Sequence, residues 1–442
     1  MRKTLEFSGR KLSVMLDADV VVCGGGPAGA AAAIAAARTG ARVLLIEQLG
    51  CFGGMGTAGL VPCFSPFTDG DKPIARGISE EVIAEMARRM GVPVEEWMPI
   101  QPEILKVLYD EMLASSGAAF KLSTKIVDVV AERRIEAVVL STHEGLRAVT
   151  GRVFVDATGD GDVAAWAGAP YELGGRRGEL QSVTLCMAFT GIDWAAYDAK
   201  RLPSGPRPDQ LIWSDDLKDG RAPLAEQHLT TGVLKCGAAI AGNNVGHVYG
   251  VNGLNESDVT RAFVEGRKIA WTFLDWYRRS VPGCSRLEMA ATASMLGVRE
   301  TRRITGEYVL NFYDYLNRAG FPDEIGRCAY PVDVHSPTPD KRELEKSRSH
   351  FLETQYGPGE SYGIPYRSLV PLKLENLLVA GRCVSCDRMI QGSLRTMPYC
   401  FVTGHAAGVA AALAATKSKG DVRAVDVAEL RSTLKGQGAY IP

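Results

Sequence analysis

The stretch that decides the fold runs from Asp19 to Gly29 and reads Asp-Val-Val-Val-Cys-Gly-Gly-Gly-Pro-Ala-Gly. Its apolar first half predicts a short buried strand, and the alanine-rich residues that follow, to about Thr39, predict a helix. Gly24, Gly26 and Gly29 have the spacing of a dinucleotide fingerprint. In that motif one glycine permits a tight turn, one lets the backbone reach the pyrophosphate, and one packs the helix against the strand. We therefore predict that phosphates bind at the N-terminus of this helix.

A second apolar run, from Arg42 to Ile46, ends at Glu47, eighteen residues after Gly29. A carboxylate at this strand end is placed to accept hydrogen bonds from a ribose diol. A glutamate, in place of a nearby arginine, disfavours the 2′-phosphate of NADP. FAD and NAD remain.

The residues after Glu47 favour FAD over NAD. Gln48 to Thr57 form a glycine-rich stretch that includes Gly53 and Gly54, where a simple NAD-binding unit would have a helix. Such a loop lets a flavin and its ribityl chain lie against the backbone. Farther along, residues 102–115 predict a helix and the charged stretch 341–353 predicts a solvated one.

At this point the sequence resembles a known family. The fingerprint, the Gly53-Gly54 loop and the run Asp156-Ala157-Thr158-Gly159-Asp160-Gly161-Asp162 resemble the FAD-dependent oxidoreductase family, within the glutathione-reductase-like flavoprotein fold. Residues 297–304, 332–335, 378–382 and 391–395 strengthen the resemblance, which extends from about residue 18 to 413. It indicates the cofactor much better than the substrate, because members act on diverse compounds.

The resemblance implies an α/β fold, with a glutathione-reductase-type FAD-binding Rossmann domain and an inserted α+β substrate domain. The FAD-binding domain would be discontinuous. Its first part would span residues 17–165 and its return segment residues 365–425. Residues 166–364 would form the substrate or cap domain, and residues 426–442 a C-terminal helix and tail.

The fingerprint, the following loop and the family's later motifs together define the expected cofactor contacts. These are Gly24, Gly26, Pro27, Ala28, Gly29, Glu47, Gln48, Gly53, Gly54, Met55, Thr57, Ala157, Thr158, Gly159, Asp160, Gly381, Arg382, Gly404, Ala406 and Ala407. Gly404, Gly408 and Ala412 would give a bare face to an alanine-rich helix, whose N-terminal dipole would stabilise an anionic flavin. A packing face of small residues is the other interpretation, and the two are compatible.

Three residues are the candidates for catalysis. His335 is the first choice for proton transfer, since imidazole titrates near neutrality and the family pattern resembles Asp-x-His here. His247 and His405 are the alternatives. Arg299 and Arg395 are expected to bind a substrate carboxylate or a flavin carbonyl.

The arginines also have a second interpretation. On a helix, Arg299 would share a face with Arg302 and Arg303, and Glu300 would lie beside Arg303, so an internal ion-pair network is the competing interpretation. Arg388 offers the same chemistry as Arg395.

The cysteines are expected to be reduced thiols in a chain with ample core. Cys383 and Cys386 form a Cys-x-x-Cys pair, but they lie outside the places where disulfide reductases of this fold carry their redox cysteines. Residues 48–60 contain no histidine, which excludes the covalent histidine link to FAD that some flavoproteins form there. Attachment through Cys51 stays open. No cluster has the spacing of metal ligands.

Charge and hydropathy limit the partners. Fifty Lys and Arg oppose 51 Asp and Glu, for a net charge of −1, which argues against a broad nucleic-acid or anionic-membrane surface. Residues 1–16 contain no apolar run typical of a signal peptide. No stretch of the sequence approaches the ~20 consecutive apolar residues of a membrane-spanning helix. We therefore expect a cytoplasmic protein with a small-molecule substrate. The oligomeric state stays open.

The sequence thus predicts an FAD enzyme that transfers a hydride between flavin N5 and a small polar organic substrate, carboxylated compounds included. Only one dinucleotide fingerprint is present, so the electron donor or acceptor is left open. Two alternatives remain: a tRNA-modifying flavoprotein, because some begin with a similar glycine motif, and a flavin-binding redox sensor or subunit without its own substrate.

Overall fold

The computed structural model describes residues 11–200, 205–224 and 232–442. Its main sheet has a parallel part with the strand order β3-β2-β1-β6, and β17 pairs with β6. The strands are β1 (Val14–Cys23), β2 (Val43–Ile46), β3 (Ala119–Lys121), β6 (Gly145–Asp156) and β17 (Leu377–Val379). Strand β17 comes from the last quarter of the chain, so a distant segment pairs with this sheet. This is the predicted α/β class with a Rossmann-like parallel sheet.

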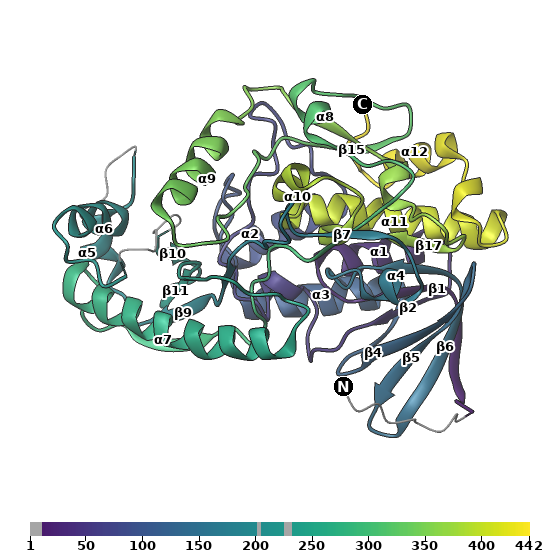
Figure 1. Ribbon diagram of the computed structural model, residues 1–442, viewed down its shortest axis with the longest axis horizontal. Helices are drawn as coiled ribbons and strands as arrows, with labels where there is room; N and C mark the ends of the chain where they lie inside the picture. Colours follow the sequence, from purple (N-terminus) through teal and green to yellow (C-terminus); the bar gives the residue numbers. More distant parts are fainter. Residues whose placement is uncertain (1–10, 201–204, 225–231) are drawn as a thin grey trace.

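The first half of β6 also belongs to an antiparallel meander. Strands β4 (Lys125–Ala131) and β5 (Ile135–Thr142) pair with each other and then with β6. Figure 1 shows these three strands extending away from the helical layer. The last four residues of β1 are fully buried, because helices and neighbouring strands cover this part of the sheet from both sides.

Five helices form the layer beside the parallel strands, in which α1 and α11 contact the strands and the other three pack against these two helices. They are α1 (Pro27–Arg38), α2 (Ile78–Met90), α3 (Pro102–Ser116), α11 (Met397–Lys417) and α12 (Val427–Gly436). The predicted helix at 102–115 is therefore confirmed, and the alanine-rich helix after the fingerprint ends at Arg38, with Thr39 as its C-cap. Helix α11 packs along α1, as Figure 1 shows.

Helix α11 corrects one expectation. It is long and apolar enough, by length and composition, to span a membrane, although we expected no such stretch. However, 94% of its most apolar window is buried inside the protein. We therefore describe α11 as a core helix. It is apolar because almost all of its residues are buried inside the protein.

A second region lies between β6 and β17 in the chain. One sheet has the order β10-β11-β9-β13, and three further pairs join β12 to β8, β14 to β7 and β15 to β16. The strands are β7 (Tyr171–Leu173), β8 (Val183–Thr184), β9 (Met187–Thr190), β10 (Leu234–Lys235), β11 (Ile240–Asn243), β12 (His247–Val248), β13 (Glu288–Thr292), β14 (Arg302–Ile304), β15 (Glu324–Cys328) and β16 (Tyr362–Pro365).

The helices of this region are α4 (Asp162–Trp166), α5 (Trp194–Asp198), α6 (Pro208–Lys218), α7 (Glu256–Ser280), α8 (Phe312–Leu316) and α9 (Lys341–Glu353), and α10 (Arg388–Leu394) follows β17 in the chain. Short 3-10 turns are η1 (Gly54–Gly56), η2 (Tyr366–Leu369), η3 (Gly381–Cys383) and η4 (Val422–Ala424). Helix α9 has no buried residue, as predicted for a solvated helix. Figure 1 places α5, α6 and α7 with β9, β10 and β11 at the end opposite the meander.

Buried apolar residues form more than one cluster. The largest joins the main sheet and its helices to buried residues between Ile304 and Ile364. A separate cluster spans Met187 to Leu287, around α7 and the four-stranded sheet. The residues of this second apolar cluster thus cover only part of the range 166–364 that we predict for the substrate or cap domain.

The motif at residues 297–304 is not a helix, so the grouping that its arginines would have on a helix does not occur. Residues 302–304 form strand β14, which pairs antiparallel with β7. Because side chains alternate along a strand, Arg302 and Arg303 point to opposite sides. This separates the arginines that a helix would have grouped.

Candidate active site

The fingerprint glycines have three distinct environments. Gly24 has a φ of +93°, and a Cβ there would stand 2.7 Å from the carbonyl oxygen of Ala157. A Cβ on Gly29 would stand 1.7 Å from the carbonyl oxygen of Gly24, so this glycine closes the turn against the helix. Around Gly26, in contrast, no atom lies within 4 Å of such a Cβ. The open side of the turn is therefore at Gly26, next to the N-terminus of α1.

Glu47 is buried at the end of β2 and organises the same turn. Its carboxylate accepts hydrogen bonds from the backbone N–H of Gly25, at 2.6 Å, and of Leu49, at 2.7 Å. Burial raises the pKa of Glu47, and these hydrogen bonds oppose that effect. The neighbouring Gln48 is exposed.

The glycine-rich loop after Glu47 folds back onto the fingerprint. The backbone N–H of Gly53 donates to the carbonyl of Gly25 at 2.9 Å. A Cβ on Gly54 would stand 3.2 Å from Cα of Gly26, so this loop lines the open side of the turn. Thr57 is fully buried, and its hydroxyl donates to the carbonyl of Phe52. Its side chain therefore holds the loop.

The run that begins at Asp156 forms a second turn beside the first. Asp156 is fully buried and accepts hydrogen bonds from the N–H and hydroxyl of Thr158 and from the N–H of Ala164. Burial raises its pKa to about 6, against those hydrogen bonds. Asp160 binds the guanidinium of Arg382 at 2.7 Å and the hydroxyl of Thr301 at 2.6 Å.

The bare face of α11 is a packing face. A Cβ on Gly404 would stand 2.1 Å from the carbonyl oxygen of Ala28, and one on Gly408 would stand 2.2 Å from that of Ala32. Ala406 and Ala407 are fully buried in the same helix. Gly404 and Gly408 therefore pack α11 against α1, and cofactor contact at Gly404, Ala406 and Ala407 stays a prediction.

The structure brings the three predicted catalytic residues into one cluster around Asp333. Arg395 donates from Nη2 to the carbonyl oxygen of Asp333 at 2.9 Å and to Oδ2 at 3.1 Å. His335 Nε2 lies 3.3 Å from Asp333 Oδ1, and His335 Nδ1 lies 3.1 Å from His247 Nε2. Arg299 acts electrostatically on Asp333, His335 and Arg395. We call these five residues the Asp333 cluster.

Strand β8 connects two members of this cluster. Arg299 donates from Nη1 to the carbonyl of Ser182 at 2.7 Å and from Nη2 to the hydroxyl of Thr184 at 3.0 Å. Thr184 is also the strand partner of His247 in the β8–β12 pair. Arg299 and His247 are thus both positioned by residues 182–184.

A chain of side-chain amides ties His335 to Arg299. The backbone N–H of His335 donates to Gln181 Oε1 at 2.9 Å, and Gln181 Nε2 donates to Gln391 Oε1 at 3.1 Å. Gln391 Nε2 then donates to the carbonyl of Arg299 at 2.6 Å. Sequence analysis did not select Gln181. The only signal for Gln391 was its place in the motif at 391–395.

The electrostatics of the cluster follow from burial and from its two guanidinium groups. Burial, together with Arg299 and Arg395, lowers the pKa of His335 to about 3 despite the opposing effect of Asp333. Burial by itself would raise the pKa of Asp333, but His335, Arg395 and Arg299 together hold it below its usual range. Burial lowers the pKa of Arg299 to about 10, so it keeps its charge at neutral pH. Two guanidinium groups therefore face one carboxylate and a neutral imidazole.

The other arginines of the motif form a separate ion-pair network. Arg303 and Arg388 both bind the buried carboxylate of Glu300, at 2.8 Å and 3.1 Å. Arg302 binds Asp162 at 2.7 Å, beside the second turn. The internal ion-pair interpretation is therefore correct for Arg303, which binds Glu300. Arg302 pairs instead with Asp162, outside the motif, and Arg299 belongs to the Asp333 cluster.

The segments that carry Arg299 and Arg395 touch the glycine-rich loop. A Cβ on Gly297, two residues before Arg299, would stand 3.4 Å from Cε of Met55. A Cβ on Gly56 would stand 3.2 Å from Sδ of Met397, two residues after Arg395. Both arginines are thus carried by segments that touch the loop at Met55 and Gly56.

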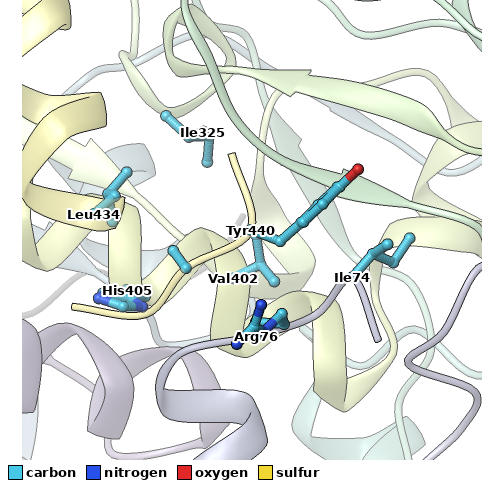
Figure 2. Close-up of a pocket in the computed structure, with 8 residues that line it drawn as sticks. Ile74, Arg76, Ile325, Val402, His405, Leu434 and Tyr440 are labelled. Atoms are coloured by element: carbon cyan, nitrogen blue, oxygen red, sulfur yellow. The ribbon is translucent and has the colours of Figure 1, made fainter. Parts of the chain in front are cut away.

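His405, the remaining alternative for proton transfer, lies elsewhere. Its Nε2 is 2.9 Å from Gln437 Oε1, and a Cβ on Gly77 would stand 2.7 Å from its ring. Figure 2 shows the ring at a small cavity of about 10 Å³, lined also by Ile74, Arg76, Ile325, Val402, Leu434, Ala439 and Tyr440. That volume is about enough for one water molecule. Its position gives His405 a packing role.

The cysteine pair gives no sign of redox activity. All ten cysteines lie in the described residues and are free thiols. Cys383 and Cys386 are buried, and burial raises the pKa of both thiols. Within the described ranges, no group of three or more His, Cys, Asp or Glu side chains is arranged to hold a metal ion.

Comparisons with known proteins bear on this site. A protein-family model described as FAD dependent oxidoreductase matches residues 19–434. No curated protein matches the sequence significantly.

Solved structures are similar at low sequence identity. A geranylgeranyl bacteriochlorophyll reductase-like protein from Thermoplasma acidophilum is 13% identical, with 96% of this chain and 85% of that chain covered and a TM-score of 0.47. A myxobacterial chondrochloren halogenase is 13% identical, with 95% and 78% covered and a TM-score of 0.41. The p-nitrophenol 4-monooxygenase of Pseudomonas putida DLL-E4 is 12% identical, with 66% and 70% covered and a TM-score of 0.37.

Proposed function

The chain belongs to the FAD dependent oxidoreductase family, and on this premise we propose that it transfers a hydride between flavin N5 and a small polar organic substrate, carboxylated compounds included. FAD is the cofactor of this enzyme. The family does not specify the kind of reaction, the class of substrate or the catalytic residues, and these are what we propose.

The two turns fit the phosphate end of FAD. Gly26 is the glycine of the fingerprint at which a Cβ would meet nothing, so a pyrophosphate can approach the backbone there. The N–H groups at the start of α1 would bind its oxygens, and Glu47 would accept hydrogen bonds from the ribose hydroxyls. The Gly53–Gly54 loop and residues 157–160 would flank the rest of the cofactor.

The single observation that carries the proposal is the charge of the Asp333 cluster. Arg299 and Arg395 act on the same carboxylate, Asp333, and on His335. Arginine stays protonated in proteins, so one positive charge in this part-buried cluster has no counterpart among its members. A substrate with one carboxylate would balance it, and bidentate guanidinium contacts would orient that substrate.

Each residue then has a defined task in the reaction. Bound FAD accepts or donates two electrons at N5. Arg299 and Arg395 bind and orient the substrate carboxylate, and the buried position of the cluster excludes water from the reacting groups. His335 handles the substrate proton, because a neutral imidazole at this place has a nitrogen that accepts one.

The organisation around this site extends the proposal. We assign the fold to the glutathione-reductase type, with residues 17–165 and 365–425 as the FAD-binding domain and an inserted substrate domain at 166–364. The cluster around α7, from Met187 to Leu287, would be the core of that inserted domain. We further propose a cytoplasmic location, and an electron donor or acceptor that needs no second dinucleotide fingerprint.

The experiment starts from purified protein, which should be yellow, with flavin absorption at about 450 nm. A panel of small hydroxy and amino carboxylates is added under anaerobic conditions, and the matching alcohols and amines without a carboxylate serve as controls. We expect at least one carboxylate to bleach the flavin and its control to fail. Colourless protein that FAD cannot reconstitute, or bleaching by the controls alone, would overturn the proposal.

Two variants test the substrate anchor. Arg395→Met should weaken the apparent affinity for the bleaching carboxylate by about 10- to 100-fold, the effect of losing a charged hydrogen bond. Its FAD content should equal that of the wild type. Arg147→Met, on a surface strand, is the control. If the flavin of the Arg395→Met variant were bleached at the same carboxylate concentrations as that of the wild type, Arg395 would not bind the substrate.

A further inference from the structure

Residues 391–395, the last motif of the sequence, pack helix α10 against the segment that carries Asp333. A Cβ on Gly392 would stand 2.8 Å from Cγ2 of Val334 and 3.1 Å from the carbonyl oxygen of Asp333. Because glycine has no side chain, it allows this close approach of two backbones. The motif therefore fixes how closely α10 lies to Asp333.

Gln391 connects the two arginines of the Asp333 cluster. Its side-chain Nε2 donates to the carbonyl of Arg299 at 2.6 Å. Its own carbonyl accepts a hydrogen bond from the backbone N–H of Arg395 at 3.2 Å. Gln391 is 1% exposed, so water competes little for these bonds. One buried residue thus joins the two backbone positions from which the guanidinium groups extend.

The amide chain that continues from Gln391 has a defined direction. At one end the backbone N–H of His335 only donates, and at the other end the carbonyl of Arg299 only accepts. Gln181 must therefore present Oε1 to His335 and Nε2 to Gln391. Gln391 in turn presents Oε1 to Gln181 and Nε2 to Arg299. Turning either amide over would place two donors or two acceptors face to face, so the chain has one arrangement.

Helix α10 holds the Arg299 segment at a second place. Arg388 is the first residue of α10, and its Nε lies 3.1 Å from Oε2 of the buried Glu300, which follows Arg299. The backbone N–H of Gln181 donates to the same carboxylate oxygen at 3.3 Å. Residues 299–300 are therefore held against α10 at both positions, and α10 sets their distance from its own C-terminal end.

We propose that Gln391 is a positioning residue, which together with Gln181 keeps Arg299 and Arg395 at the spacing that binds a substrate carboxylate. This inference rests on the proposed function, which gives the two arginines that task. Gln391 acts through the residues that it holds. Guanidinium side chains have many rotamers, so fixing the backbones that carry them removes part of the ordering cost of binding. A looser spacing would keep both charges but weaken the affinity for the carboxylate.

The first test needs no substrate. In the holoprotein, exchange of the His335 N–H for deuterium is followed by mass spectrometry of peptides that cover residues 332–336. Gln181→Met removes the acceptor and should speed this exchange by about 10-fold, the effect of losing a buried hydrogen bond. Gln391→Met acts one residue farther along the amide chain and should also speed it, because Gln181 is no longer held. Wild-type exchange in Gln391→Met would overturn the proposal.

The second test measures the anchor. Formate, a small monoanion, is titrated into the holoprotein and its binding is measured by calorimetry. Gln391→Met should weaken formate binding by about 10-fold at wild-type FAD content, whereas the exposed Gln355→Met should not change it. In an Arg395→Met background, Gln391→Met should add less than about 2-fold, because a spacing between two arginines no longer exists. Wild-type affinity in Gln391→Met, or a fully additive loss in the double variant, would overturn the proposal.

Gln391→Glu gives a pH signature that a merely structural role would not produce. A protonated carboxyl at position 391 can donate to the carbonyl of Arg299, whereas an ionised one only accepts. Formate affinity should therefore be near that of the wild type at about pH 5.5 and fall by about 10-fold at about pH 8.5. An ionised carboxylate would also attract the neighbouring guanidinium groups, and the uncharged Gln391→Met separates this effect. Gln391→Glu also tests the proposal if Gln391→Met does not fold, and equal formate affinity at both pH values would contradict it.

These experiments distinguish failure of the positioning role from failure of the proposed function. If formate does not bind the wild type and no carboxylate bleaches its flavin, the proposed function fails, and exchange at His335 still decides whether the amide chain holds that residue. If the wild type binds formate and Gln391→Met binds it equally well, only the positioning role of Gln391 fails.

Discussion

Gly404 on α11 lies so close to Ala28 on α1 that a Cβ at residue 404 would stand 2.1 Å from the Ala28 carbonyl oxygen. Ala28 is the second residue of α1, directly after the fingerprint turn. The contact therefore joins the return segment to the element that is expected to bind the pyrophosphate.

Gly404→Ala should destabilise the protein, because the two helix backbones must separate to admit a methyl group. We expect the free energy of unfolding to fall by about 1–3 kcal/mol or more, the usual cost of overpacking. Urea unfolding of the holoprotein measures it. Gly436→Ala is the matched control, since Gly436 is also helical but has no atom within 4 Å of its Cβ position. Equal stability of the two variants would contradict the packing argument.

Gly26→Ala and Gly29→Ala should separate cofactor binding from folding. A methyl group on Gly26 meets open space, so the stability of the FAD-free protein should change by less than about 0.5 kcal/mol. FAD affinity should fall by about 10-fold or more, because the backbone can no longer approach the pyrophosphate. Gly29→Ala should instead lower the stability of the FAD-free protein, since its Cβ would meet the Gly24 carbonyl oxygen at 1.7 Å.

Fluorescence titration with FAD and urea unfolding of the FAD-free protein give both quantities. Unchanged FAD affinity in a folded Gly26→Ala variant would mean that the pyrophosphate binds elsewhere.

Protonation of His405 should make stability depend on pH on the acid side. Burial lowers its pKa from about 6.5 to about 4 in the folded protein. Between these values the unfolded chain binds a proton that the folded protein excludes, so the free energy of unfolding falls as pH decreases from about 6.5 to about 4. His405→Gln should reduce this slope by up to ~1.4 kcal/mol per pH unit. Urea unfolding at pH 7 and pH 5 measures it, with the exposed His143→Gln as the control; an unaltered slope would show that His405 is not the group responsible.

The thiols should differ sharply in reactivity. Cys51 is the half-buried cysteine and the other nine are buried. A thiolate is the reactive form, so in the folded protein dithionitrobenzoate should modify about one thiol rapidly. All ten should react after unfolding. Cys51→Ser should abolish the rapid phase. Rapid modification of two further thiols in that variant would indicate that Cys383 and Cys386 are accessible.

Features that depend on residues close together in the chain could be predicted from the amino-acid pattern. Gly24 and Gly29 could be assigned to a turn and a close contact because both roles require the absence of Cβ at a set spacing. Glu47 at a strand end, the helix at 102–115 and the solvated helix at 341–353 follow from local patterns of apolar and charged residues. The cofactor followed from the same short-range signals together with the family resemblance.

Only the tertiary structure decided how the catalytic candidates are grouped. The members of this cluster come from separate segments of the chain, which carry His247, Arg299, Asp333 and Arg395. No local sequence pattern predicts which of them lie close together. Residues 302–304 became a strand because they pair with β7, so Arg302 and Arg303 left the group that a helix would have formed with Arg299. The contact of Gly404 with Ala28 on α1 likewise appears only in the folded chain. Contacts between distant segments depend on packing of the whole chain, and sequence spacing does not contain that information.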